Sequence, residues 1–198
     1  LNPPNRNYYG VWFDSTNPSI GYAVSWYIAA FDYIPYAIHT SNGGSTFTPM
    51  QTFCAGQDIW FTNWYTGVIV GNGINQTTDG GNTWAVTHNG NSSATNSVHF
   101  KDAMNGYSCG LNGKIRKTSD GGASWTQVNV TSSDDYYDVF VSGNKTFVVG
   151  FDGEVLSSSD NGSTWVSYPV PSSLYSIFFL DNNNGWFCGS SGRTYYTN

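Results

Sequence analysis

The chain has 198 residues, a formal net charge of −6 and only 10% charged side chains. Its seven lysine and arginine residues form no extended basic patch, which argues against nucleic-acid binding, because that function needs concentrated positive charge. The sequence contains no run of 18 or more apolar residues, so it predicts no membrane-spanning helix.

A short motif recurs along the chain at a nearly constant spacing. Its clearest copy is Thr-Ser-Asp-Gly-Gly-Ala-Ser-Trp at residues 118–125, related copies occupy residues 77–84 and 158–165, and a weaker one occupies 40–47. The aspartate or asparagine stands at positions 42, 79, 120 and 160, which are 37, 41 and 40 residues apart. A period near 40 residues, with β-rich sequence between the copies, is typical of four-stranded propeller blades. The sequence therefore predicts an all-β fold, a five-bladed β-propeller.

Taken in chain order, the strand patterns divide the chain into five units of one propeller domain. The first unit contains an aromatic-rich insertion at residues 27–35 that departs from the repeat. The later units repeat an apolar strand, a glycine-bounded strand, a third strand and the motif. The predicted units span approximately residues 11–55, 56–95, 96–135, 136–172 and 173–198.

Each motif is predicted to fix a tight turn. An aspartate followed by glycine accepts backbone N–H bonds within the turn, while glycine adopts the positive φ that the turn needs. The tryptophan then begins the next strand and can be buried between blades. We interpret six residues as structural turn locks: Asp79, Asp120, Asp160, Trp84, Trp125 and Trp165.

The fifth unit is incomplete in this sequence. Aligned on the third unit, Asn198 matches Ser119, one residue before the motif aspartate. The unit therefore lacks a motif and a fourth strand. We expect either that the N-terminal segment completes this blade, in the same or a neighbouring molecule, or that the blade has an open edge. The candidates for strand exchange are Leu1, Pro3, Pro4 and Asn7, and the prolines suit an edge strand.

The motif, S/T-x-D-x-G-x-S/T-W, resembles the Asp-box or BNR repeat. The longer pattern from Phe100 to Trp125 resembles the propeller repeats of the photosystem II stability and assembly factor family, and this resemblance covers nearly the whole chain. It implies a propeller in which Asp-box turns join the third and fourth strands of each blade. It says little about function, because propellers host unrelated activities. The chain departs from that family in its five units and its acidic surface.

The titratable residues do not suggest an enzyme. Glu154 is the only glutamate, and Asp102 and Asp181 occupy the same loop position in two units, which indicates a structural role. The three histidines lie in different units: His39, His88 and His99. The acidic cluster between the third and fourth units could be a calcium site or a solvated turn, and it consists of Asp134, Asp135 and Asp138. We predict no catalytic residues, no cofactor and no metal site.

Several aromatic residues lie outside the repeat positions. Exposed aromatic rings can anchor a protein interface or stack on sugar rings. The candidates for either role are Tyr27, Phe31, Tyr33, Tyr36, Trp64 and Tyr65. Cys109 and Cys188 stand where other units have valine, so we expect buried, free thiols.

The low charge and the many asparagine, serine, threonine and tyrosine residues suggest a secreted protein. Four N-x-S/T sequences are candidates for N-glycosylation, at Asn75, Asn91, Asn129 and Asn144. Such sequences arise by chance in a chain this rich in these residues, so they support secretion only weakly.

These observations favour a non-enzymatic extracellular structural protein that assembles with copies of itself, as a fibre or sheath subunit joined by strand or edge contacts. The alternative is a secreted carbohydrate- or protein-binding propeller of lectin type. A photosystem-assembly type of factor ranks third. The expected partners are other copies of the chain or glycans.

Overall fold

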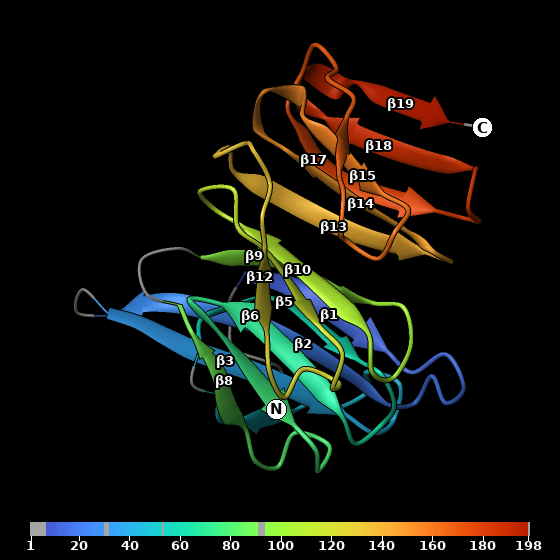
Figure 1. Cartoon of the computed structure of the whole chain (residues 1–198). Helices are drawn as coiled ribbons and strands as arrows, with labels where there is room; N and C mark the ends of the chain where they lie inside the picture. Colours follow the sequence, from blue (N-terminus) through green and yellow to red (C-terminus); the bar gives the residue numbers. More distant parts are fainter. Residues whose placement is uncertain (1–6, 30–31, 53, 91–93, 198) are drawn as a thin grey trace.

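The computed structural model describes residues 7–29, 32–52, 54–90 and 94–197 (Figure 1). These residues form nineteen β-strands and two short 3-10 turns, with no α-helix in this part of the chain. None of the described segments is therefore a helix that could cross a membrane. The prediction of an all-β fold is confirmed.

The strands form five antiparallel sheets, each ordered as in the sequence. The first contains β1 (Tyr8–Phe13), β2 (Gly21–Ala29), β3 (Asp32–Thr40) and β4 (Thr48–Met50). The second contains β5 (Gly56–Phe61), β6 (Gly67–Gly71), β7 (Gly73–Thr77) and β8 (Ala85–Asn89). The third contains β9 (Thr95–Phe100), β10 (Gly106–Gly110), β11 (Ile115–Thr118) and β12 (Thr126–Val128).

The last two sheets differ in strand number. The fourth sheet contains β13 (Tyr136–Ser142), β14 (Lys145–Gly150), β15 (Val155–Ser158) and β16 (Val166–Ser167), with the turn η1 (Phe151–Gly153) before β15. The fifth has three strands, β17 (Leu174–Phe179), β18 (Gly185–Gly189) and β19 (Thr194–Thr197), with the turn η2 (Ser190–Gly192) before β19. Five blades with an incomplete fifth blade agree with the sequence-based prediction.

The first strands of successive sheets pack side by side in the order β1, β5, β9, β13 and β17. The sheets therefore follow one another as blades (Figure 1). Among the strands described, β17 and β1 do not pack on each other in this way. The row of blades is not closed into a ring.

One contact is repeated at each junction between blades. A side chain on the second strand of one blade lies against a side chain on the first strand of the next blade. We call the surface of a blade that meets the next blade its forward face, and the surface that meets the preceding blade its backward face. The Tyr22 and Phe61 rings stack with centroids 3.9 Å apart, and Phe147 and Phe179 stack at 4.1 Å. The forward faces are represented by Tyr22, Val68, Tyr107 and Phe147, and the matching backward faces by Phe61, Phe100, Val141 and Phe179. Burial of these side chains provides the apolar core.

The motif turns join the third and fourth strands of their blades. The Asp120 carboxylate accepts bonds from the Ser124 N–H (2.9 Å), the Ser124 hydroxyl (2.6 Å) and the Thr118 hydroxyl (2.7 Å). Gly121 and Gly122 have φ values of 71° and 92°, which favour glycine. The Trp125 indole N–H donates to the Gly122 carbonyl at 3.1 Å.

The same hydrogen bonds affect the acidity of these aspartates. Bonds from the Thr164 hydroxyl and N–H lower the pKa of Asp160 to about 2. In the first blade an amide replaces the carboxylate, and Asn42 Oδ1 accepts from the Thr46 N–H at 2.9 Å. The weaker copy of the motif therefore forms a related turn.

The turns of the second, third and fourth blades also contact the preceding blade. The Tyr22 hydroxyl donates to the Gly80 carbonyl (3.1 Å), and the Gln76 amide donates to the Gly121 carbonyl (2.7 Å). The motifs thus contribute to the junctions between blades as well as to their own hairpins.

Candidate functional site

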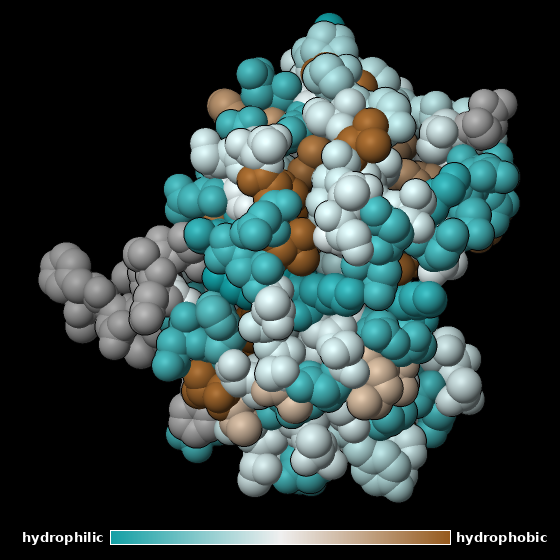
Figure 2. Space-filling view, in the orientation of Figure 1, coloured by the Kyte–Doolittle hydropathy of each residue, from teal (hydrophilic) through white to brown (hydrophobic). Residues whose placement is uncertain are grey.

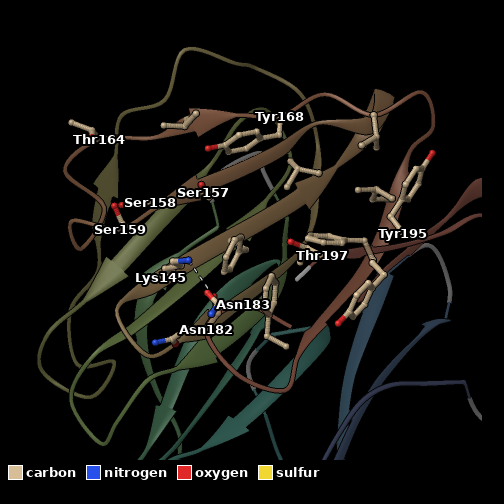
Figure 3. A pocket seen from close by; sticks show the side chains of 18 residues that line it. Lys145, Ser157, Ser158, Ser159, Thr164, Tyr168, Asn182, Asn183, Tyr195 and Thr197 are labelled. Atoms are coloured by element: carbon tan, nitrogen blue, oxygen red, sulfur yellow. Dashed lines mark hydrogen bonds between the residues drawn. The ribbon is translucent and has the colours of Figure 1, made fainter. Parts of the chain in front are cut away.

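The candidate site is a groove between the fourth and fifth blades, with a volume of about 570 Å³. Phe147, Val155 and Tyr168 of the fourth blade line one side, and Phe179 and Tyr195 of the fifth blade line the other. Figure 3 shows Tyr168 and Tyr195 on these two sides of the groove. Figure 2 shows apolar surface among polar groups in the upper part of the molecule, where these two blades lie.

The groove occupies a position that a tryptophan fills in an earlier blade. In the second blade, the Trp84 ring meets Phe61 edge-on at 6.1 Å and is 6% exposed. The fifth blade preserves the other half of this arrangement, because Phe147 stacks on Phe179 as Tyr22 stacks on Phe61. In the fifth blade, Phe187 on β18 meets Phe179 edge-on at 5.7 Å, but no described residue beyond β19 supplies the tryptophan of a motif. The groove is therefore the space that a motif tryptophan and a fourth strand occupy in complete blades.

Among the described residues, no strand pairs with the outer edge of β19, which lies beside the groove. In the fourth blade, the Tyr168 N–H donates to the Val155 carbonyl at 2.8 Å, so Val155 directs its backbone groups toward the outer strand. Thr194 in the fifth blade corresponds to Val155, because each is the first residue of the third strand of its blade. Val155 pairs with Val149, and Thr194 pairs with the equivalent residue Cys188. Because backbone direction alternates along an antiparallel strand, Thr194 and Tyr196 direct their N–H and C=O groups to the open edge of β19.

One end of the groove is polar (Figure 3). The Lys145 ammonium donates to the Asn182 carbonyl at 3.2 Å, and the Ser142 hydroxyl donates to Asn182 Oδ1 at 3.2 Å. Across the groove, the Tyr195 hydroxyl bonds to the Ser172 hydroxyl at 3.0 Å, and this bond, with the contribution of Arg193, lowers the pKa of Tyr195. The groove thus combines an apolar floor with one cationic end.

The off-repeat aromatic residues do not gather at this groove. Trp64 and Tyr65 are exposed on the loop between β5 and β6. Tyr27 and Tyr33 lie on the paired strands β2 and β3, so the insertion lengthens a hairpin, and Tyr36 is half-buried on β3. Phe31 lies outside the described residues.

The residues suggested for strand exchange are placed only in part. Leu1, Pro3 and Pro4 lie outside the described residues. The Asn7 carbonyl accepts a 2.6 Å hydrogen bond from the Ser25 hydroxyl. Asn7 is therefore held at the first blade.

The suggested glycosylation sites differ in accessibility. Asn75 lies on β7 with 1% of its surface exposed, which leaves no room for a glycan. Asn129 and Asn144 are exposed, and Asn91 lies outside the described residues.

The acidic cluster between the third and fourth units does not converge. Asp138 is directed inward, where it accepts from the Ser176 hydroxyl at 3.1 Å, whereas Asp135 accepts from the Asn112 N–H at 2.9 Å. No group of potential metal ligands is found in the part of the chain that the structure describes.

The cysteines only partly follow the expectation from the repeat. The three thiols are free, and Cys54 and Cys109 are buried. Cys188 is exposed, although it aligns with buried residues of other blades, because none of the described strands packs against its side of β18. The expectation of burial at Cys188 was wrong.

Sequence reasoning predicted an incomplete fifth blade, either completed by an N-terminal segment or left with an open edge, but not the groove beside it. The absence of a motif after Thr197 was the available signal. The volume and lining of the groove depend on Phe147, Val155 and Tyr168 of another blade. Their approach to the fifth blade is a tertiary contact that the repeat spacing does not specify.

Comparisons with known proteins agree with the fold. Residues 89–169 match the family model described as photosynthesis system II assembly factor YCF48. A search of curated protein sequences finds no match. The structure of YCF48 from Cyanidioschyzon merolae is 14% identical, with a TM-score of 0.72, over 100% of this chain and 68% of that chain.

Other propellers are similar in fold at equally low identity. U3-55K is 11% identical, with a TM-score of 0.79, over 99% of this chain and 62% of that one. An ancestral GH74 enzyme is 15% identical, with a TM-score of 0.74, and this chain covers only 32% of its length. The repeat motif, the five sheets and these similarities together identify the chain as a BNR-like β-propeller that resembles YCF48.

Proposed function

We propose that this protein is a non-enzymatic binding module whose fifth blade receives an extended segment of a partner protein by strand addition. The observation that carries the proposal is that the outer edge of β19, which no described strand pairs with, lies directly beside the groove. Main-chain hydrogen bonds to an open edge provide affinity, and a pocket for alternate side chains provides specificity.

The groove determines what the segment should carry. Its space corresponds to that of Trp84 in the second blade, so an aromatic side chain suits it. Lys145 at the polar end favours a neutral or acidic residue beside that aromatic side chain. An extended segment with an aromatic residue and few basic residues therefore matches the groove.

The comparisons favour this role over the fibre or sheath subunit that the sequence analysis preferred. The matching family model is described as that of an assembly factor, the type of role that the sequence analysis ranked third. No comparison supports a fibre. Protein binding is common to an assembly factor and to the binding-module alternative, so it is the function that we adopt.

The test uses a peptide that the chain itself provides. A labelled peptide with the sequence of residues 158–168 contains a motif, a tryptophan and a fourth strand, and its binding can be followed by fluorescence anisotropy. We expect saturable binding that weakens about tenfold or more when the tryptophan of the peptide is replaced by alanine, because about 1.4 kcal/mol corresponds to a factor of ten.

A matched pair of protein variants locates the binding. Thr194→Pro removes an outward N–H at the first position of β19, where proline is tolerated, and Thr194→Ala is its control. We expect Thr194→Pro to abolish binding and Thr194→Ala to retain it. Equal binding by the two variants, or no saturable binding by the unaltered protein, would contradict strand addition.

Carbohydrate binding is a second candidate, supported by a hollow of about 430 Å³ beside Trp64. His39, Asp79 and Asn82 also line it, so an exposed ring lies near polar groups that suit a sugar. Trp64→Ala should then abolish retention on an immobilised polysaccharide, whereas Tyr175→Ala, at another exposed ring, should not. Retention of both variants would exclude Trp64 as the sugar-binding ring. This candidate goes with the proposal of an extracellular location.

A further inference from the structure

We propose that a second copy of this chain docks the backward face of its first blade onto the forward face of the fifth blade, which joins subunits head to tail. This contact uses the forward face of the fifth blade and not the open edge of β19, and of the residues named on that face only Tyr196 also lines the groove. The chain already contains contacts of this kind, because each of the four junctions between its blades joins a forward face to a backward face.

The forward face of the fifth blade is apolar and uncovered. Phe178, Trp186 and Tyr196 form a row across its three strands, since each is paired with the next in register. The Trp186 side chain is 40% exposed, whereas Tyr22 at the equivalent position of the first blade is 3% exposed. Cys188 is likewise exposed on this face. The fifth blade therefore presents a surface of the kind that earlier blades bury.

The backward face of the first blade is the complementary surface. Val11 is 65% exposed, but its equivalent in the second blade, Ile59, is 2% exposed. Phe13 is also exposed, and with Val11 and Phe47 it lines a groove of about 220 Å³. The lining of this groove is apolar or aromatic throughout: Tyr8, Val11, Phe13, Tyr22, Ala23, Ile38 and Phe47.

The two faces match in detail through one aromatic contact. At the first junction, Trp12 and Tyr22 lie against Phe61 with ring centroids 5.3 and 3.9 Å away. Phe178 and Trp186 take the places of Trp12 and Tyr22, because both pairs are cross-strand neighbours at the same register.

Phe13 takes the place of Phe61 and is already positioned for this contact. A Cβ atom on Gly21 would lie 2.5 Å from the Phe13 ring, and one on Gly67 would lie 2.6 Å from the Phe61 ring. Each ring therefore lies over the glycine of its neighbouring strand. We expect Trp186 of one copy to stack on Phe13 of the other.

A second copy is the occupant that these surfaces specify. Both faces belong to every molecule, they are the two halves of one repeated interface, and none of the residues named on them is charged. Within the described chain, β17 does not pack on β1, so one molecule does not use both faces on itself. A head-to-tail contact of this type closes into a ring or extends as a filament, according to the rotation between subunits.

Sedimentation of the protein over a concentration series tests the contact. We expect the weight-average mass of the unaltered protein to rise to at least twice the monomer mass. Val11→Lys and Trp186→Lys each place a charge on one face and should prevent this rise. Val86→Lys, at an exposed valine on β8, is the matched control and should associate normally.

Mixing the two variants gives the sharpest result. Val11→Lys retains the forward face of the fifth blade, and Trp186→Lys retains the backward face of the first. Equimolar mixing should therefore restore association, but only as far as a dimer. A monomeric unaltered protein at every concentration would overturn the proposal. Association of Val11→Lys alone would also overturn it, because it would indicate that two fifth blades pair with each other.

A second measurement needs no substitution on either face. Cys188 lies on the forward face, so its alkylation should become at least severalfold slower as the concentration of the unaltered protein rises. Circular dichroism of each lysine variant shows whether it is folded, and where one is not, the alkylation result decides. An alkylation rate that is independent of concentration would contradict the docking.

Discussion

The carboxyl group of Asp58 lies 3.2 Å from the hydroxyl group of Ser97 on the next blade. The same hydroxyl lies 2.8 Å from the carboxyl group of Asp138 on the fourth blade. A serine hydroxyl has one proton, so it can donate to only one of the two carboxyl groups. The other contact becomes a hydrogen bond only if a carboxyl group carries the second proton. This geometry agrees with the raised pKa of Asp58, about 7, which results mainly from burial.

Replacement of Asp58 by asparagine should change the pH dependence of stability. The unfolded carboxyl group releases its proton near pH 4, whereas the folded one keeps it up to about pH 7, so its contribution to stability falls as the pH rises between these values. The amide of the asparagine variant cannot ionise. In urea denaturation, we compare the free energy of unfolding of Asp58→Asn with that of the unaltered protein. We expect this difference to shift in favour of the variant by about 1 to 4 kcal/mol between pH 4.5 and pH 8.

Asp181→Asn is the control for this measurement. Hydrogen bonds from the Asn184 and Asn183 N–H groups lower the pKa of Asp181, so its contribution is present above pH 4 and is lost only at lower pH. Its effect on stability should be the same at pH 4.5 and pH 8. An equal effect of Asp58→Asn at the two pH values would contradict a buried, protonated Asp58.

Gly122→Ala should destabilise the fold more than Gly192→Ala. Both glycines have positive φ, 92° and 68°, but a Cβ atom at residue 122 would lie 2.6 Å from the Val68 side chain, whereas none lies within 4 Å at residue 192. We expect losses of about 2 to 4 kcal/mol and about 1 kcal/mol in chemical denaturation. Equal losses would mean that the turn does not pack tightly on the preceding blade.

Asp120→Ala should lower the free energy of unfolding by about 1 to 2 kcal/mol, because the Ser124 N–H and two hydroxyl groups lose their acceptor. Asp120→Asn should cost less, since Asn42 already performs this role in the first blade. Thermal unfolding compares the two. Peptide binding at the fifth blade should be unaffected, and its loss at unchanged thermal stability would assign the motif a binding role.

Thiol labelling should distinguish the three cysteines. In dilute native protein, Cys188 should react with a thiol reagent, whereas Cys54 and Cys109 should react only after unfolding, because both are buried and burial raises the pKa of Cys54 to about 12. Mass spectrometry counts the labels on each chain. More than one label before unfolding would show that the junctions between blades open readily.

The sequence alone determined the features that depend on local chemistry. The spacing of the motifs predicted blades, and each turn is built by neighbours in the sequence, as between Asp120 and Ser124. The missing motif after Thr197 likewise predicted an incomplete fifth blade. Such features can be predicted because the hydrogen bonds and backbone angles involved lie within a few residues.

The tertiary structure alone decided which repeated positions are covered. Val11 and Ile59 are equivalent in the repeat, as are Cys188 and Cys109, but one member of each pair is exposed because no blade lies against it. The raised pKa of Asp58 and the groove beside Tyr195 also depend on residues of other blades. Burial is a property of packed neighbours, and a repeat pattern does not specify which neighbours a terminal blade will have.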